Sequence, residues 1–240
     1  MEKTITISLC NRPEYTSRTL KNLFYCYGIG AYNVSIFVEP VDQKVISIAL
    51  EYAQKFKNIN VFINKTRLGC NYNIFQSLSY AFDKLHSNFN IHIEDDVLLG
   101  KDALYYFNWC NNHYYQDDNV FTVSSYERSK QEDESKLNLV KRHKWFIPWG
   151  WATWSNRWHN GYRQELLDRI SNPLYKSWDC HTNDIRGDRF EIRPIVARSQ
   201  NIGAENGVHV PSAAWHQKNQ YNDYWIESVG EYVTHFEELI

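Results

Sequence analysis

The first hundred residues alternate between two hydrophobic patterns, and this alternation constrains the fold more than any other feature. Short apolar runs rich in β-branched residues, which are typical of strands, occur at residues 4–9, 33–38, 59–63 and 90–93. Amphipathic stretches with helical spacing lie between them, at residues 14–27, 41–56 and 75–85. Strands and helices in this order, joined by short connections, predict right-handed βαβ crossovers and an α/β fold with a parallel sheet.

Polar residues follow each of the four predicted strands. In open parallel sheets, ligands bind in the crevice outside the carboxyl ends of the strands. We therefore expect four segments to meet in one crevice, and these are residues 11–12, 39–40, 64–71 and 94–96. The third segment ends at Asn71, which we place among the residues that contact the ligand.

Three consecutive carboxylates, Glu94, Asp95 and Asp96, end the fourth strand. Their mutual repulsion needs an offset, and the usual one is a divalent cation, for which oxygen ligands favour Mg²⁺ or Mn²⁺. The alternative is that Asp95 and Asp96 cap the following helix while Glu94 is solvated. No second acidic cluster lies nearby in the sequence, which weakens the interpretation as a two-metal phosphoesterase or nuclease.

The composition differs between the two ends of the chain. With 240 residues, 43% hydrophobic and 22% charged, the chain has an ordinary globular composition. All nine tryptophans, however, lie at or after Trp109, and the strand and helix patterns become irregular after residue 120. This asymmetry indicates two halves with different tasks.

The charge balance argues against a nucleic-acid partner. Lys and Arg number 26 against 28 for Asp and Glu, a net charge of −2, whereas nucleic-acid-binding proteins usually carry a basic excess. Residues 127–144 are densely charged and are interpreted as a solvated excursion, either a lid or a disordered loop. Their basic cluster, residues 141–144, leaves peripheral contact with a phosphate group or a membrane open as an alternative.

Nothing in the sequence predicts a membrane span or an exported protein. The longest uncharged stretch, residues 22–38, contains several turn residues, and the first residues alternate like a strand instead of forming the apolar core of a signal peptide. The five cysteines are scattered and lack any C-x-x-C spacing, so neither a zinc site nor a disulfide framework is expected. We expect a cytoplasmic protein.

The sequence Ile-His-Ile-Glu-Asp-Asp at residues 91–96 resembles the D-x-D-type motif of GT-A-fold glycosyltransferases, and more closely the E-D-D motif of the inverting N-acetylglucosaminyltransferase I family. Further motifs similar to those of this family occur in the same order: Cys10-Asn11-Arg12, Glu39, Phe-Ile-Pro-Trp-Gly-Trp at residues 146–151, Ser177-Trp178-Asp179, Arg193-Pro194 with Arg198, and Gly207-Val208. The resemblance implies a single GT-A-type domain over residues 1–240. Its Rossmann-like nucleotide-sugar half would be residues 1–108, and its smaller, mixed acceptor half residues 109–240.

The resemblance also implies how a nucleotide-sugar donor would bind. Asp96 would ligate Mn²⁺ or Mg²⁺, while Asp95 and Glu94 would contact the ribose and the sugar. Arg12 would contact the diphosphate, although a structural ion pair explains an arginine here equally well, and Glu39 would accept a hydrogen bond from uracil. Gly207 and Val208 would belong to a loop that orders over the donor, and His209 after them is either a second metal ligand, a phosphate contact or a solvent-exposed histidine.

Inversion requires a base that deprotonates the acceptor hydroxyl. The resemblance implies Asp179 in this role. The alternatives are that Asp179 caps the helix that follows it, or that Asp184 or Asp188 acts instead. Three tryptophans near these motifs, Trp149, Trp151 and Trp178, are interpreted either as walls for a sugar ring or as core.

Together these residues predict an inverting, metal-dependent glycosyltransferase that moves a sugar, GlcNAc foremost, from a UDP-sugar to a hydroxyl of a glycan or glycoconjugate. Two other classes stay open. A divalent-metal phosphoesterase would need a second acidic or histidine cluster, and a non-catalytic carbohydrate-binding protein would leave the acidic triplet unexplained.

Overall fold

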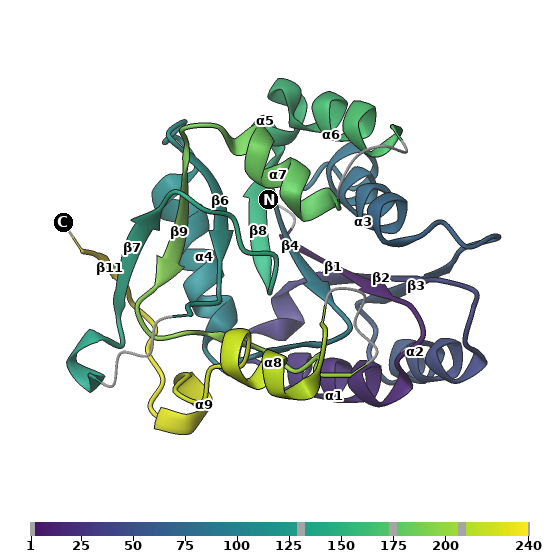
Figure 1. Ribbon diagram of the computed structural model, residues 1–240, viewed down its shortest axis with the longest axis horizontal. Helices are drawn as coiled ribbons and strands as arrows, with labels where there is room; N and C mark the ends of the chain where they lie inside the picture. The colour runs from purple at the N-terminus through teal and green to yellow at the C-terminus, as the bar shows by residue number, and fades with distance from the viewer. Residues whose placement is uncertain (1–2, 129–132, 173–176, 206–209, 240) are drawn as a thin grey trace.

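A computed structural model of the chain describes residues 3–128, 133–172, 177–205 and 210–239. Within these residues the centre is a nine-stranded sheet with the order β11-β7-β9-β6-β8-β4-β1-β2-β3 (Figure 1). The strands of this sheet are β1 (Lys3–Leu9), β2 (Asn33–Val38), β3 (Ile59–Ile63), β4 (Phe89–Glu94), β6 (Val120–Ser124), β7 (Leu139–His143), β8 (Trp151–Trp154), β9 (Phe190–Pro194) and β11 (Glu237–Glu238). A separate ribbon pairs β5 (Val97–Leu99) with β10 (Ser199–Asn201) in antiparallel fashion.

The predicted parallel sheet is confirmed. Strand β1 pairs in parallel with both β2 and β4, and β2 pairs in parallel with β3. On the other side of β4 the sheet becomes mixed, because β8 runs antiparallel to both β4 and β6, while β6 and β9 are parallel. The regular alternation in the sequence thus corresponds to the parallel part, and the irregular sequence after residue 120 to the mixed part.

Helices cover both faces of the sheet, as Figure 1 shows. One face carries α1 (Pro13–Leu23), α2 (Gln43–Lys55) and α4 (Ala103–Tyr114), whose apolar residues join the strands in the larger core cluster. The other face carries α3 (Cys70–Ser79), α6 (Arg163–Ile170) and α7 (Trp178–Arg186), which share an aromatic-rich cluster. The shorter helices are α5 (Ser155–Arg157), α8 (Ala213–Asn219) and α9 (Ile226–Val229).

Local sequence signals place the starts of α1 and α2 at the carboxyl edge of the sheet. Helix α1 begins at Pro13, whose fixed φ suits the first helical position and whose missing N–H costs nothing there. Helix α2 is capped by Asp42, whose side chain accepts hydrogen bonds from the backbone N–H groups of Lys44 and Val45 at 2.8 and 3.3 Å. Arg12 is therefore held directly between the end of β1 and the first turn of α1.

The expectation of a solvated excursion at residues 127–144 is wrong for its second half. The structure describes this segment apart from residues 129–132, and β7 within it pairs with β9 and with β11. Arg142 in β7 forms ion pairs with Asp117 at 2.9 Å and with Glu238 at 2.5 Å. The charge of Arg142, which suggests a loop in the sequence, is thus neutralised by residues far along the chain, and the backbone of β7 joins the sheet.

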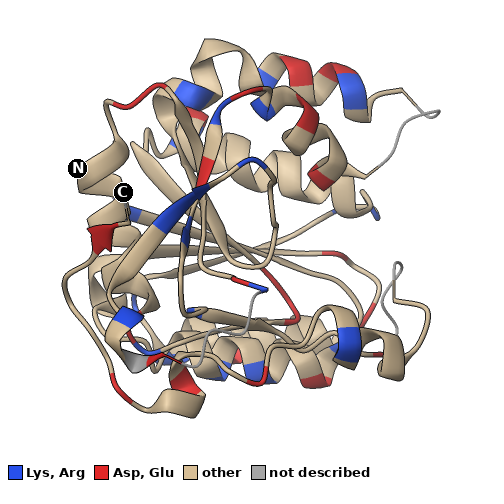
Figure 2. Cartoon of the chain, turned by 60° about the vertical axis from the view of Figure 1, so that its left-hand side comes forward, with Lys and Arg blue, Asp and Glu red and all other residues tan. Residues whose placement is uncertain are grey.

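Three further features concern the distribution of charge, the cysteines and the apolarity of the helices. Lys and Arg are interspersed with Asp and Glu on the helices in Figure 2, and no face in that view carries a single sign. The five cysteines are free. None of the helices in the described part of the chain has the length and apolarity that a bilayer crossing requires.

Candidate active site

The acidic triplet meets Arg12 at the carboxyl ends of β1 and β4. The Arg12 Nη1 atom lies 2.8 Å from Asp96 Oδ2, and Nη2 and Nε of the same guanidinium both hydrogen-bond the Asp95 carboxylate. The guanidinium also lies over the ring of Tyr15, 5.5 Å from its centroid. One fork of donors therefore bridges two of the three carboxylates.

Arg12 does not neutralise the triplet completely. Burial raises the pKa of Asp95 to about 6, although the charge of Arg12 opposes this shift. The pKa of Glu94 is raised well above its ordinary value, first by burial and then by the neighbouring charges of Asp96 and Asp95. The site thus has an excess of negative charge that a bound cation would offset.

The donor set of the triplet fits a divalent cation that also binds substrate. Mg²⁺ sites typically combine one or two carboxylates with water and substrate phosphate oxygens, and Asp96 can supply one such ligand. No cluster of three or more His, Cys, Asp or Glu side chains that could hold a metal by itself occurs among the described residues. The arrangement suits a cation that shares its coordination with a ligand.

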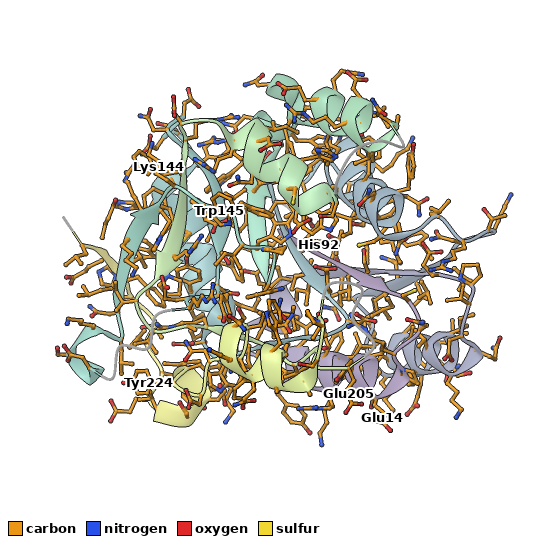
Figure 3. The ribbon with its side chains drawn as sticks, in the orientation of Figure 1. Glu14, His92, Lys144, Trp145, Glu205 and Tyr224 are labelled. Carbon is orange, nitrogen blue, oxygen red and sulfur yellow. The ribbon has the colours of Figure 1, made fainter. Side chains whose placement is uncertain are left out.

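A loop from the C-terminal part of the chain lies directly on Asp96. The backbone N–H of Ile202 donates to the carbonyl oxygen of Asp96 at 2.8 Å, and a Cβ atom added at Gly203 would lie 2.1 Å from Asp96 Oδ2. The loop is also tied to α1, because the N–H of Glu205 donates to the hydroxyl of Tyr15 at 3.1 Å, and Figure 3 shows Glu205 close to that helix. Residues 201–205 therefore close one side of the crevice.

His216 is a site residue that the sequence analysis missed. This histidine of α8 is buried, and its Nε2 atom donates to Asn201 Oδ1 at 2.8 Å, since an amide oxygen only accepts. Burial lowers its pKa, and the nearby charge of Asp96 opposes this shift. Only the tertiary fold brings it to the triplet, because no motif surrounds it in the sequence. His209, Gly207 and Val208 lie outside the described residues.

Asp179, in the first turn of α7, lies within electrostatic reach of the same crevice. Burial is the main cause of the raised pKa values of Glu94 and Cys70, the charge of Asp179 adds to both, and the Cys70 thiol lies 3.9 Å from Glu94 Oε2. Ser177 Oγ donates a hydrogen bond to the Asp179 carboxylate, and the N–H of Trp178 donates to Asn71 Oδ1 at 3.0 Å. The first turn of α7 is thus fixed to the first turn of α3, and Cys70 at the start of α3 lies beside Glu94.

The two alternative bases do not share this position. Asp184 is exposed, and its carboxylate lies 3.5 Å from the guanidinium of Arg169. Asp188 is also exposed and follows the end of α7, away from the first turn that contacts Asn71. The charge of Asp179, by contrast, contributes to the raised pKa of Glu94, after burial and the charges of Asp96 and Asp95.

Glu39 at the end of β2 is buried and has backbone partners. Its two carboxylate oxygens accept the N–H of Leu68 at 2.9 and 3.2 Å. The same 64–71 segment is fixed by Asn64, which exchanges side-chain hydrogen bonds of 2.9 Å with Asn73 and Gln76. Glu39 therefore shapes the third segment of the crevice, and all four predicted segments meet there.

The sequence itself decides the family. The profile of the GNT-I family matches residues 2–224, nearly the whole chain. The chain belongs to the GNT-I family. No curated protein matches the sequence.

Solved structures similar to this GNT-I family chain share its fold. PcManGT, a mannosyltransferase from Pyrobaculum calidifontis in complex with GDP-Man and Mn²⁺, is 17% identical with a TM-score of 0.53, and the match covers 80% of this chain and 54% of that one. S. aureus TarS 1-349 in complex with UDP-GlcNAc is 10% identical with a TM-score of 0.58, and the match covers 83% and 58%. This likeness establishes the GT-A fold that the sequence predicted. The chain spans a little over half the length of these structures.

The tryptophans of this GNT-I family chain mostly form core. Trp178 is 3% exposed and stacks on Trp151, which is fully buried, with ring centroids 5.6 Å apart. His92, labelled in Figure 3, contacts the edges of both rings. Of the two interpretations of Trp151 and Trp178, sugar wall or core, their burial and stacking favour core. Trp149 is half-buried, and Trp145 is 66% exposed.

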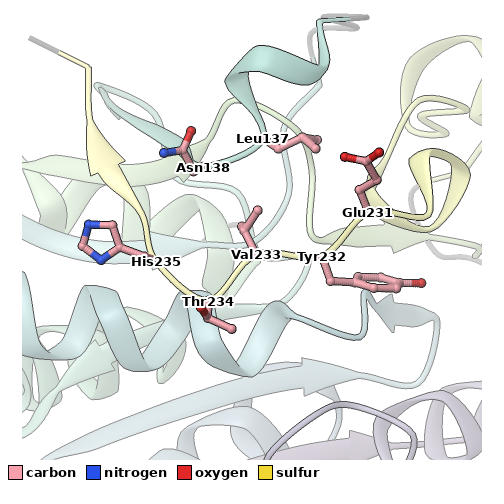
Figure 4. Close-up of a pocket in the computed structure, with 7 residues that line it drawn as sticks. All are labelled: Leu137, Asn138, Glu231, Tyr232, Val233, Thr234 and His235. Carbon is pink, nitrogen blue, oxygen red and sulfur yellow. The ribbon is translucent and has the colours of Figure 1, made fainter.

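A hollow of about 500 Å³ elsewhere on the molecule does not belong to the site. It is lined by Leu137, Asn138 and residues 231–235, which surround the chain leading into β11 (Figure 4). None of these residues contacts the triplet, and the lining offers no cluster of acidic side chains. We assign it no role.

Proposed function

We propose that the protein is a glycosyltransferase that moves a sugar from a UDP-sugar, GlcNAc foremost, to a hydroxyl of a glycan or glycoconjugate. The observation that carries the proposal is the cluster of Arg12, Asp95 and Asp96 at the carboxyl ends of the strands, with Asp179 close enough for its charge to act on Glu94. A diphosphate leaving group requires positive charge, which Arg12 and a cation held by the carboxylates would supply, and an acceptor hydroxyl requires a base, which Asp179 would supply.

Binding of the donor follows from the contacts of the crevice. Arg12, whose guanidinium holds Asp95 and Asp96, would place a fixed positive charge near the diphosphate. Glu39, beside the 64–71 segment, is the candidate for the uracil ring, and Asn71 and Glu94 line the path toward the sugar. Asp96, with Asp95 beside it, would hold Mn²⁺ or Mg²⁺, which supplies Lewis-acid neutralisation of the leaving diphosphate. His216, whose pKa responds to the charge of Asp96, is a second candidate beside His209 for a histidine of the site.

Transfer is proposed to occur in a single displacement with inversion. Asp179 removes the proton of the acceptor hydroxyl while the hydroxyl oxygen bonds to the anomeric carbon. The bond from that carbon to the diphosphate oxygen breaks, and the nucleoside diphosphate leaves with the electron pair. The loop over Asp96, residues 201–205, limits access of water, which would otherwise compete with the acceptor.

We also propose that residues 1–108 and 109–240 act as the donor half and the acceptor half of one domain. Arg12, Glu39 and the triplet lie in the first half, whereas Asp179 lies in the second. The boundary between the halves then coincides with the crevice itself.

Donor binding tests the proposal directly. Isothermal titration with UDP, UDP-GlcNAc, UDP-glucose and GDP-mannose, each with Mn²⁺ and with EDTA, should give metal-dependent binding of a UDP ligand that Asp96→Asn weakens strongly. The matched control is Asp184→Asn, an exposed aspartate outside the crevice. If no nucleotide sugar binds with Mn²⁺ present, the proposed activity is wrong.

A metal-dependent phosphoesterase is less well supported. It would need a second metal-binding cluster beside the triplet, and none occurs among the described residues. The same titration separates the two functions, because a phosphoesterase would release phosphate from the ligands in the absence of any acceptor.

A further inference from the structure

An aromatic pocket of about 430 Å³ lies on the other side of α3 from the acidic triplet. Its lining comes from β2, β3, α3, the π-helical turn that follows α3 and the first residue of α6: Phe37, Phe62, Gln76, Ser79, Tyr80, Asp83, Lys84 and Arg163. The volume falls within the range typical of small-ligand sites. None of the residues assigned to the catalytic crevice lines it.

Three rings form one wall of the pocket. Phe37 stacks on Phe62 with centroids 5.0 Å apart, and Tyr80 contacts both rings at 5.6 and 4.6 Å. Phe62 and Tyr80 are only partly buried, so this wall is accessible. An accessible aromatic ring packs well against the apolar C–H face of a pyranose ring.

The polar side of the pocket is rigidly organised. Asp83 accepts hydrogen bonds from Trp158 Nε1 at 3.0 Å and from Arg163 Nε at 2.9 Å, so both its oxygens are oriented. The Arg163 guanidinium lies over the ring of Phe75, and its two terminal nitrogens have no partner within the described part of the chain. The pocket thus offers an oriented acceptor and free donors, as sugar hydroxyls require.

Two further features distinguish the pocket from an incidental groove. The hydroxyl of Ser79 is buried and has no hydrogen-bond partner among the described residues, which is a cost unless a ligand satisfies it. The helix continues as a π-helical turn over Tyr80–Lys84, a distortion that occurs frequently at functional sites.

The pocket is connected to the catalytic crevice along α3. The helix begins at Cys70, whose thiol contacts Glu94, and ends at Ser79 in the pocket, roughly 13 Å further on. Gln76, a lining residue, also donates to Asn64 Oδ1 at 2.9 Å in the segment that shapes the donor side. A glycan of several units can therefore reach both places.

We propose that this pocket binds a neutral pyranose unit of the acceptor glycan, away from the hydroxyl that reacts. Seven of its eight lining residues belong to the donor half, so the acceptor glycan would extend across both halves. The identification of the glycan as the acceptor rests on the proposed function, whereas saccharide binding itself does not. The lining carries one carboxylate and two cationic side chains, Lys84 and Arg163, which gives no strong preference for an ionic ligand.

Saturation-transfer NMR on the full chain tests the proposal with four probes: the methyl glycosides of GlcNAc, mannose and glucose, and maltotriose. EDTA is present and nucleotide is omitted, so that the donor site does not contribute. We expect ring-proton signals from at least one probe. Phe62→Leu should weaken binding about tenfold, the loss expected for one aromatic contact, and Arg163→Met should also weaken it. Tyr25→Leu, at an exposed tyrosine outside the pocket, is the matched control and should bind normally.

Three results would overturn the inference. The first is the absence of signal from every probe. The second is an equal signal from Phe62→Leu, Arg163→Met and the control. The third is a concentration-dependent dimer in light scattering that Phe62→Leu abolishes, which would make the pocket a contact between copies of the chain. Circular dichroism checks that each variant is folded. If Phe62→Leu does not fold, Arg163→Met still tests the pocket, because it changes a partly exposed residue. If the unchanged chain binds a saccharide probe but binds no UDP ligand, the proposed function is refuted and the pocket remains a saccharide site.

Discussion

Replacing Gly203 by alanine should weaken metal-dependent donor binding without unfolding the protein. The new Cβ would lie 2.1 Å from Asp96 Oδ2, 2.9 Å from Asp96 Cγ and 3.2 Å from Arg12 Nη1. Real contacts of this kind are never so short, so the Asp96 carboxylate must rotate away from Arg12 or residues 201–205 must move off the crevice.

Either movement affects the atoms that the proposed function assigns to the donor. Inserting one methyl group into a well-packed site typically costs about 1–3 kcal/mol. If that cost falls on the donor-bound arrangement, the dissociation constant for UDP with Mn²⁺ rises about 5- to 150-fold. The melting temperature in the absence of ligand should change little, because the short 201–205 loop can move without disturbing the sheet.

Isothermal titration of UDP in the presence of Mn²⁺ measures this effect. Gly30→Ala is the matched control, since no heavy atom lies within 4 Å of a Cβ at that position. If Gly203→Ala binds UDP within about twofold of the unchanged chain, while the control behaves normally, the assignment of Asp96 to the donor site is refuted.

Two other predictions follow from the site, and a third concerns Glu191, a buried carboxylate of β9. Asp179→Asn should keep UDP affinity and lower transfer about 10²- to 10⁴-fold, whereas Asp184→Asn should transfer normally in a product assay; equal rates would contradict the base assignment. Arg12→Gln should weaken UDP binding but strengthen binding of Mn²⁺ alone, measured by electron paramagnetic resonance, because the competing guanidinium is gone. Burial raises the pKa of Glu191 to about 7 from its ordinary 4.5, although Arg193 opposes the shift. The stability that this buried group contributes is therefore present below pH 4.5 and lost as the pH rises to about 7. The fall in melting temperature across that window should be smaller in Glu191→Gln, and an identical fall would argue against a raised pKa.

The parallel half of the fold was predictable because its signals are local. Strand β4 is buried on both faces, so its sequence is a short apolar run that ends abruptly in carboxylates, and this pattern is visible without any tertiary information. Since parallel strands share one carboxyl edge, the position of the crevice followed from the order of these elements.

The rest of the fold depends on partners that are distant in the sequence. Strand β7 contains three basic residues and resembles a loop, and only the pairing of Arg142 with Asp117 and Glu238 explains how it joins the sheet. His216 likewise reaches the triplet through a short helix and its hydrogen bond to Asn201. Local propensity cannot reveal such contacts, because the stabilising partner lies outside any sequence window.

Two of the nine tryptophans, Trp151 and Trp178, pack directly behind one carboxylate, that of Asp179. Trp178 immediately precedes Asp179, and its ring is fixed by stacking on Trp151 and by edge contacts with Phe146 and His92. A large buried ring with several aromatic neighbours has few alternative positions, so the first turn of α7 cannot shift without opening the core. If Asp179 is the base, it must lie about 3 Å from the acceptor oxygen, and small displacements would then cost rate. Under the proposed function, Trp151 and Trp178 would hold Asp179 from behind, while the accessible aromatic side chains of the proposed saccharide pocket would contact the acceptor.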